Sequence, residues 1–325
     1  MKMLNLFSKY FLLLFMLLFS LLSLFLNDLI LIWFFIEISN FLFICLMNNY
    51  MLNKKSIFFY FFIQIMASFL MIFSFIINNI FIYNNYIKLM IMFSLLLKLS
   101  IPPFHLWLPV LSIYTPWNIL LLILTIQKIT PFYIWSLIKI NIMLIYFFII
   151  LCSIIPPFMM MKLTNLKILM SYSSINQSSW MIMLMYMKNI IWFKYFICYS
   201  FIMLNIFILY NLHKIFMNFN YKNYYFNIFI LIYMLNMAGM PPFTFFFIKW
   251  YSMFIFMYNS NLFFILILMM LSSLLMLFIY INMMINSLFI FSYKSKLMNL
   301  MLNMNFYNIF MFFLGLIFSS FIMMI

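Results

Sequence analysis

Residues 95–105 read LLLKLSIPPFH, so a lysine lies in an apolar run that two consecutive prolines interrupt a few positions later. A charge at the centre of a bilayer is costly, and lysines within membrane spans are therefore rare and usually functional. Two adjacent prolines remove two backbone donors and leave carbonyl groups free to bind water or an ion. A buried cation beside a broken helix is the arrangement that an ion path through a membrane needs.

A second interruption of the same kind lies far along the chain, where residues 239–243 read GMPPF and Lys249 follows in apolar surroundings. Two such breaks in similar settings suggest an internal duplication, which is common among membrane transporters. We therefore expect two halves of related architecture, each with one broken helix.

The composition identifies the class of protein. The chain of 325 residues is 70% hydrophobic and 6% charged, with a mean hydropathy of +1.23. These values exclude a soluble globular protein and are typical of a polytopic membrane protein. At about 20 residues per span, the length allows roughly ten to twelve helices. No cleavable signal pattern precedes the first span, so we expect the N-terminal segment to be part of the mature protein.

The net charge of +15 would suggest nucleic-acid binding in a soluble protein. Here most lysines flank apolar spans, where they anchor helix ends, so we expect membrane lipids and no nucleic acid as a partner. Cys45, Cys152 and Cys198 lie far apart and match neither a metal-binding spacing nor a disulfide framework. The sequence has no glycine-rich nucleotide loop and no cysteine cluster for an iron–sulfur centre. We therefore expect partner proteins to carry any redox chemistry.

Codon usage explains much of the unusual composition. All 17 basic residues are lysines, and the chain has 48 Phe and 36 Met but only 2 Gly. The favoured residues have AT-rich codons, and the depleted residues have GC-rich codons. This bias indicates a compact organellar genome, and it concerns the gene rather than the fold.

The apolar runs predict about eleven membrane-spanning helices. They cover residues 10–26, 29–47, 57–77, 88–112, 117–138, 141–160, 167–187, 190–210, 226–256, 262–286 and 306–324. The fourth and ninth contain the proline breaks and lie five helices apart, and an odd offset places repeats in opposite orientation. We therefore predict a single all-α, antiporter-like transmembrane domain over 1–325. Its first five helices (10–138) and next five (141–286) form inverted repeats, and 306–324 is an additional helix.

The lysines also predict how the chain is oriented. Ten lysines flank spans on the side that holds the N-terminus, four flank them on the opposite side, and three lie within spans. Excess lysine marks the inner side of a membrane protein. The N-terminus should therefore face the cytosol-equivalent compartment and the C-terminus the opposite one.

Only two acidic residues are present, Asp28 and Glu37. Asp28 follows Asn27 at the start of the second span, and we predict that it is an N-cap in the membrane interface. Glu37 lies about 13 Å deeper, near the bilayer centre. A carboxylate there must be protonated or paired with a cation. It is either a functional group or a neutral acid hydrogen-bonded inside the bundle, and the scarcity of acids favours a function.

Three lysines are predicted to lie within spans. Lys98 is about 15 Å from Lys88 along its helix, and Lys128 lies at a similar depth in the next span. Lys249 follows the second break. The proton affinity of a buried amine depends on the charge of its neighbours, so lysines with one glutamate can pass protons between them. The alternative is that a lysine extends its amine to the interface, which is most credible for Lys249.

Other polar groups are less specific. His105 follows the first break, where it could relay protons or bind carbonyls that the break leaves free, and both readings stay open. His213 lies in a polar loop beside Lys214 and is a weak candidate. Residues 171–180 read SYSSINQSSW, a patch of hydroxyls and amides within a span. Close helix packing is the commoner use of such a patch, and a water chain is the alternative.

Four segments in this order resemble one family. Residues 98–109 read KLSIPPFHLWLP, similar to K-L-G-x-x-P-F-H-F-W-x-P, and 127–131 read QKITP, similar to Q-K-x-A-P. Residues 166–175 read LKILMSYSSI, similar to L-R-K-x-x-A-Y-S-S-I. Residues 238–250 read AGMPPFTFFFIKW, similar to G-G-L-P-P-F-x-x-F-x-P-K-W. Over most of its length the chain thus resembles the subunit 2 family of NADH:ubiquinone oxidoreductase, respiratory complex I.

This resemblance implies an antiporter-like fold that couples NADH oxidation by ubiquinone, catalysed elsewhere in the complex, to proton translocation. It matches Glu37 to the family's membrane glutamate, and Lys98, Lys128 and Lys249 to the lysines of its polar axis, with His105 as a possible relay. It implies no cofactor or metal in this chain, because other complex I subunits bind NADH, FMN, the iron–sulfur clusters and ubiquinone. The implied partners are those subunits, especially the neighbouring antiporter-like ones.

The resemblance further implies the mitochondrial inner membrane, with the N-terminus in the matrix and the C-terminus in the intermembrane space. Animal members lack the first three helices of their relatives, which agrees with about eleven helices here. The chain departs from the family pattern at Ser100 and Ser179, which replace glycines, at Val110, which replaces an acid, and at Ile248, which replaces a proline.

Two alternatives stay open, a free-standing cation/proton antiporter of similar fold and a mainly structural membrane-arm subunit. The leading reading makes two structural predictions. The side chains of Glu37 and Lys98 should face each other inside the bundle, because an unpaired carboxylate at this depth is costly. The helices should break near both proline pairs.

Overall fold

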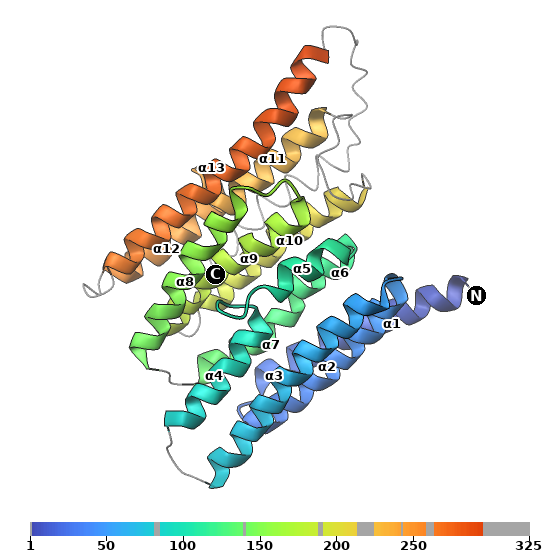
Figure 1. Ribbon diagram of the computed structural model, residues 1–325, viewed down its shortest axis with the longest axis vertical. Coiled ribbons are helices and arrows are strands. Elements are labelled where there is room, and N and C mark those ends of the chain that lie inside the picture. Colours follow the sequence, from blue (N-terminus) through green and yellow to red (C-terminus); the bar gives the residue numbers. More distant parts are fainter. Residues whose placement is uncertain are drawn as a thin grey trace. The chain divides into compact units, whose positions relative to one another are not determined.

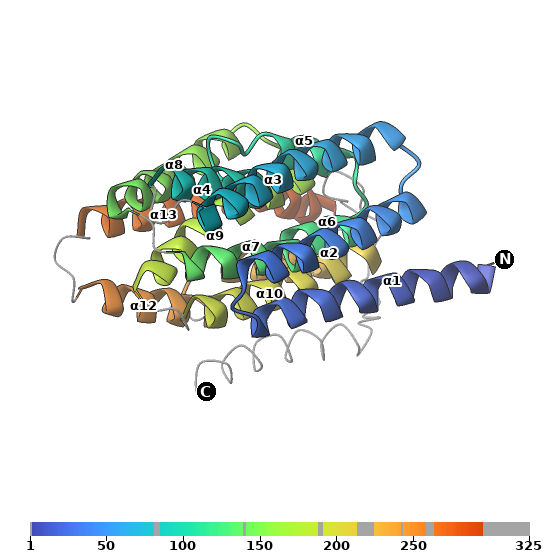
Figure 2. The same ribbon diagram turned by 90° about the horizontal axis from the view of Figure 1, so that it is seen from below.

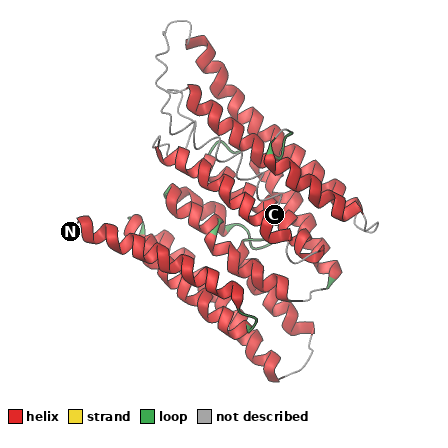
Figure 3. Ribbon diagram, turned by 180° about the vertical axis from the view of Figure 1, so that it is seen from behind, coloured by secondary structure: helices red, strands yellow, loops and turns green. Residues whose placement is uncertain are grey.

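The regular structure of this chain is helical because a backbone in lipid must satisfy its own polar groups. A computed structural model describes residues 2–80, 85–138, 141–187, 191–212, 224–241, 243–257 and 263–294. Every regular element within these ranges is a helix, which confirms the predicted all-α class (Figure 3). The predicted span 306–324 and His213 lie outside the described residues.

Seven helical stretches in the described ranges are long and apolar enough to cross a membrane, and one of them, Trp117–Leu137, consists of two consecutive helices. They are Ser8–Phe25, Leu29–Tyr50, Lys54–Ile77, Trp117–Leu137, Ile142–Met160, Ile191–Asn211 and Phe263–Met283. Large apolar side chains are exposed on their surfaces, as at Phe41 (65%), Phe58 (67%) and Phe69 (65%). Such faces are unfavourable in water and favourable in hydrocarbon, so the chain is a multi-pass membrane protein.

The chain divides into two units, Met1–Ile145 and Tyr146–Ile325. The helices of the first unit are α1 (Lys2–Leu22), a 3₁₀ turn η1 (Ser23–Phe25), α2 (Leu29–Tyr50), α3 (Lys54–Ile80), α4 (Asn85–Leu99), α5 (Trp107–Tyr114), α6 (Trp117–Leu124) and α7 (Ile126–Leu137). Within it α2 packs between α1 and α3, α3 packs against α4, and α7 contacts α1, α2 and α4 (Figures 1 and 2). Helix α7, which carries Lys128, therefore touches both α2, which carries Glu37, and α4, which carries Lys98.

One helix break was not predicted from the sequence. The expected continuous span 117–138 is divided into α6 and α7 at Thr125, which has φ −115° and ψ −81°. The Thr125 hydroxyl donates to the Leu121 carbonyl at 2.8 Å, and threonine hydroxyls that bond back in this way compete with the helical ladder. The break matters because Lys128 follows it by one turn, with its N–H donating to the Thr125 carbonyl.

The prediction for Asp28 was only partly right. Asp28 occupies the N-cap position of α2, but its side chain makes no capping hydrogen bond. Asparagines do cap other helices: the Asn53 side chain accepts from the N–H of Lys55 at the start of α3, and Asn165 accepts from that of Lys167. A short side chain at a cap position bonds only when its rotamer and the first turn agree, which sequence spacing does not determine.

The second unit contains most of α8 (Ile142–Met160), then α9 (Leu166–Met187), α10 (Ile191–Leu212), α11 (Tyr224–Ala238), α12 (Thr244–Met257) and α13 (Phe263–Lys294). Helices α11 and α13 run side by side, and α12 contacts α9, α10, α11 and α13 (Figure 1). Helix α9 carries the polar patch 171–180 and is buried along almost its whole length. A helix with this many hydroxyls and amides belongs in the protein interior rather than against lipid.

Both predicted proline breaks are confirmed, and they have the same local structure. Helix α4 ends at Leu99 and α11 at Ala238, and the next residues, Ser100 and Gly239, have φ of 56° and +83°. In each case the second residue after the helix donates back across the last turn, from Ile101 to Leu96 at 3.0 Å and from Met240 to Leu235 at 3.2 Å. This is the Schellman ending, which normally places glycine where Ser100 lies.

Candidate functional site

An ion pair joins Glu37 of α2 to Lys98 in the last turn of α4. The Lys98 Nζ lies 3.1 Å from the Glu37 Oε1, and the lysine side chain is 2% exposed and the glutamate side chain 29%. The prediction that the two side chains face each other is therefore confirmed. A carboxylate is the partner that a buried ammonium requires, and the C-terminal end of α4 also favours positive charge. The pair therefore places two opposite charges in contact inside the bundle.

A small cavity in the same unit connects this pair to a second lysine. Its volume is about 10 Å³, near the lower limit for one water molecule. Both Lys98 and Lys128 line it, and Lys128 is only 4% exposed. The remaining lining residues come from α2, α3, α5, α6, α7 and the first break: Ile36, Asn40, Tyr60, Gln64, Ser100, Trp107, Leu108, Ile123, Gln127 and Pro131. The structure therefore brings two of the three predicted intramembrane lysines to one polar space.

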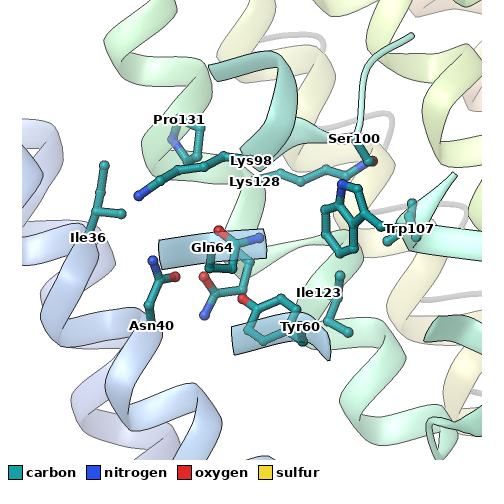
Figure 4. Close-up of a pocket in the computed structure, with 12 residues that line it drawn as sticks. Ile36, Asn40, Tyr60, Gln64, Lys98, Ser100, Trp107, Ile123, Lys128 and Pro131 are labelled. Carbon is teal, nitrogen blue, oxygen red and sulfur yellow. The ribbon is translucent and has the colours of Figure 1, made fainter. Parts of the chain in front are cut away.

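Figure 4 shows how the polar side chains are arranged around this cavity. Lys98 extends toward the helix that carries Ile36 and Asn40, while Asn40, Gln64 and Tyr60 lie together on one side of the space. The Tyr60 hydroxyl and the Asn40 amide nitrogen are buried and have no hydrogen-bond partner among the described residues. A tyrosine hydroxyl can both donate and accept a hydrogen bond, so Tyr60 adds a polar group to the cavity that Lys98 and Lys128 line.

His105 is buried in the segment between α4 and α5, 6% exposed. It is not among the residues that line the cavity beside Lys98 and Lys128. The structure therefore places it near the break and outside the lining of this cavity. Its role as a relay stays a prediction.

Lys249 lies in the second unit and is 4% exposed, so its amine does not extend to an interface. Its Nζ donates to the Ala238 carbonyl at 2.9 Å, on the last residue before the second break. The amine also lies 5.3 Å from the Phe245 ring centre and 5.7 Å from that of Trp180. Both acids of the sequence belong to the first unit, so within its own unit Lys249 is held by a carbonyl and two aromatic faces.

Gly239 gives a direct test of this packing. A Cβ at this position would lie 2.9 Å from the Lys249 Cδ and 3.2 Å from its Nζ, and the φ of +83° is unfavourable for a side chain. We expect Gly239→Ala to destabilise the protein by about 1–2 kcal/mol from the backbone alone and to displace the lysine. The measurement is the thermal stability of the membrane protein, with Ser100→Gly as the control, which should be neutral or stabilising. Equal stability of Gly239→Ala and the parent protein would contradict this geometry.

Sequence reasoning missed several residues of the site. Asn40 and Gln64 are amides inside apolar spans, a signal that could have identified them, because intramembrane amides usually face a helix interface. Tyr60 had no such signal among 22 tyrosines. Its place at the cavity follows only from the packing of α3 against α4.

The chain has relatives of known family. Residues 26–276 match the family described as NADH:quinone oxidoreductase/Mrp antiporter, TM. The NADH-ubiquinone oxidoreductase chain 2 of Anopheles gambiae is 32% identical over 234 residues, 67% of this chain and 68% of that protein. That of Aedes aegypti is 36% identical over 160 residues, 48% of this chain and 47% of that protein.

A solved structure supports the fold. A chain of respiratory complex I from Thermus thermophilus with bound aureothin is similar with a TM-score of 0.77 at 16% identity, covering 97% of this chain and 79% of that chain. At this identity the likeness establishes the fold alone. Membership of a family rests instead on the match over residues 26–276 and on the sequence relatives. These show that the chain belongs to the NADH:quinone oxidoreductase/Mrp antiporter family, among its NADH-ubiquinone oxidoreductase chain 2 members.

Proposed function

We propose that this chain is a proton-translocating membrane-arm subunit of NADH:ubiquinone oxidoreductase. The observation that carries the proposal is the Glu37–Lys98 ion pair, whose lysine shares a cavity with Lys128. Family membership supplies the coupling reaction, because the relatives are named as chains of that oxidoreductase. Without such a site, membership would be equally compatible with a purely structural subunit.

The chemistry follows from the charges. When the Lys98 amine gives up its proton toward Lys128, the Glu37 carboxylate loses its counter-charge and attracts the next proton. Each transfer therefore changes the proton affinity of the following site. Lys249 is the third protonatable group of the path, and His105 is a possible relay. The matching breaks beside Lys98 and Lys249 support a pair of inverted repeats, 10–138 and 141–286.

The redox reaction of the complex takes place in other subunits. Partner subunits bind NADH, FMN, the iron–sulfur clusters and ubiquinone, and the nearest partners are other antiporter-like membrane subunits and lipids. The compartment is the mitochondrial inner membrane, with the N-terminus in the matrix and the C-terminus in the intermembrane space. The excess of lysine on the N-terminal side supports this orientation.

Purification tests the assembly state. We expect the chain, extracted in mild detergent, to migrate with subunits that carry flavin and iron–sulfur absorbance. The reason is that the sequence has no redox motif, so partner subunits must supply the energy for proton translocation. The measurement is native electrophoresis with in-gel NADH oxidation and mass spectrometry of the band. A stable dimer of this chain alone would favour a free-standing antiporter instead.

A further inference from the structure

The break after α11 leaves two backbone carbonyls without helical donors. The N–H groups of Met240 and Gly239 already bond to the carbonyls of Leu235 and Asn236. The next two carbonyls, of Met237 and Ala238, would pair with positions 241 and 242, which are prolines and have no N–H. A buried carbonyl without a donor is costly in a membrane protein, so each needs a side-chain donor.

Two side chains supply these donors at adjacent carbonyls. The Gln177 Nε2 of α9 donates to the Met237 carbonyl at 3.1 Å, and the Lys249 Nζ donates to the Ala238 carbonyl at 2.9 Å. Gln177 is 1% exposed, so no solvent competes for its amide. The amide and the amine therefore divide the two free carbonyls between them.

Tyr195 of α10 determines which way the Gln177 amide points. Its hydroxyl donates to the Gln177 Oε1 at 2.5 Å, and Tyr195 is fully buried. An amide whose oxygen accepts from a tyrosine presents its NH₂ group on the other side, toward Met237. The Tyr195 ring also packs against Phe245 at 4.9 Å between centroids, and Phe245 faces the Lys249 amine. Gln177 and Tyr195 are therefore linked to the lysine on two sides, through the neighbouring carbonyls of Met237 and Ala238 and through the Phe245 ring.

We propose that Gln177 and Tyr195 are positioning residues for Lys249. They occupy the Met237 carbonyl, so that the lysine amine has one backbone acceptor, the Ala238 carbonyl, and one position. Glutamine does not exchange protons itself and acts through the lysine. The proposal rests on the proposed function of Lys249 in proton transfer and adds the residues that set its geometry. Without Gln177, the Met237 carbonyl would compete for the ammonium group and hold it off the path.

The test uses the assembled complex in sealed membranes and measures the rate of NADH-driven proton uptake per assembled complex, because uptake and NADH oxidation are expected to slow together. Gln177→Leu keeps the volume but removes both hydrogen bonds, and we expect proton transfer through this site to fall about fivefold, the change that one net hydrogen bond supports. Gln177→His should restore most of it, because histidine carries one donor and one acceptor nitrogen. Tyr195→Phe, which removes only a hydroxyl, should show a smaller loss in the same direction.

The matched control is Asn176→Leu, which removes the neighbouring amide on the same helix. Asn176 is 1% exposed, and its side chain makes no hydrogen bond within the described ranges. It should keep the parent rate of proton uptake. A parent rate in assembled Gln177→Leu, an equal loss in Asn176→Leu, or no rescue by histidine would each overturn the proposal. If Gln177→Leu does not assemble, Tyr195→Phe decides, and a parent rate there refutes the positioning role.

Lys249→Met, measured in parallel, separates this proposal from the proposed function. A parent rate of proton uptake in Lys249→Met would remove Lys249 from the path and contradict both proposals. A loss in Lys249→Met with a parent rate in Gln177→Leu and Tyr195→Phe would leave the proposed function standing and reject only the positioning residues.

Discussion

Replacing Lys98 with methionine should leave the complex assembled and lower NADH:ubiquinone reductase activity and proton uptake together. Methionine has nearly the volume of lysine, so packing at this buried site should survive while the protonatable amine is lost. We expect a loss of about tenfold or more, because a positioned proton-transfer group commonly contributes roughly 100-fold to the step it serves. The two activities should fall in parallel, because coupling between a redox reaction and charge movement acts in both directions.

The measurement is the reductase rate and the rate of proton uptake, called the proton yield below, in membranes that carry the substitution. Native electrophoresis determines the subunit content. Lys88→Met is a suitable control, because Lys88 lies near the start of α4 and is partly exposed. It should retain both activities. Full rate and full proton yield in an assembled Lys98→Met variant would exclude Lys98 from the path and favour a structural subunit.

The second large effect concerns the partner of this lysine. Glu37→Gln leaves the Lys98 ammonium buried without a counter-charge, and loss of one member of a buried pair costs about 3 kcal/mol or more. Because 29% of the Glu37 side chain is exposed, the pair is only partly desolvated, and we expect a cost near the lower end of the range for buried ion pairs. We therefore expect Glu37→Gln to lower the temperature at which the subunit is lost from the complex, and to abolish the charge exchange at Lys98.

The double variant Glu37→Gln with Lys98→Met separates stability from function. It removes both charges, so most of the lost stability should return, while proton transfer should stay as low as in the single variants. Thermal stability and proton yield are measured on all three variants. Additive losses of stability in the double variant would show that the two residues do not interact, contrary to the 3.1 Å contact.

Much of the fold could be predicted because it depends on local chemistry. Proline has no N–H and fixed φ, so the interruptions near Pro102 and Pro241 follow from the residues themselves. The pairing of Glu37 with Lys98 could also be predicted, since a lone acid at that depth needs a cation and few cations lie there. The break at Thr125 could not, because many threonines continue a helix and only the side-chain bond to Leu121 marks this one.

The sequence by itself determined the membrane class, the two proline breaks and the set of ionisable groups within the spans, because each depends on what single residues can do in hydrocarbon. Only the tertiary structure decided which groups meet. It placed Lys98 and Lys128 on one cavity and gave Lys249 the Ala238 carbonyl in place of a carboxylate. It also joined Gln177 to Met237, 60 positions along the chain. The physical reason is that a buried polar group must find a partner, and the packing of helices far apart in sequence selects which one is within 3 Å or so.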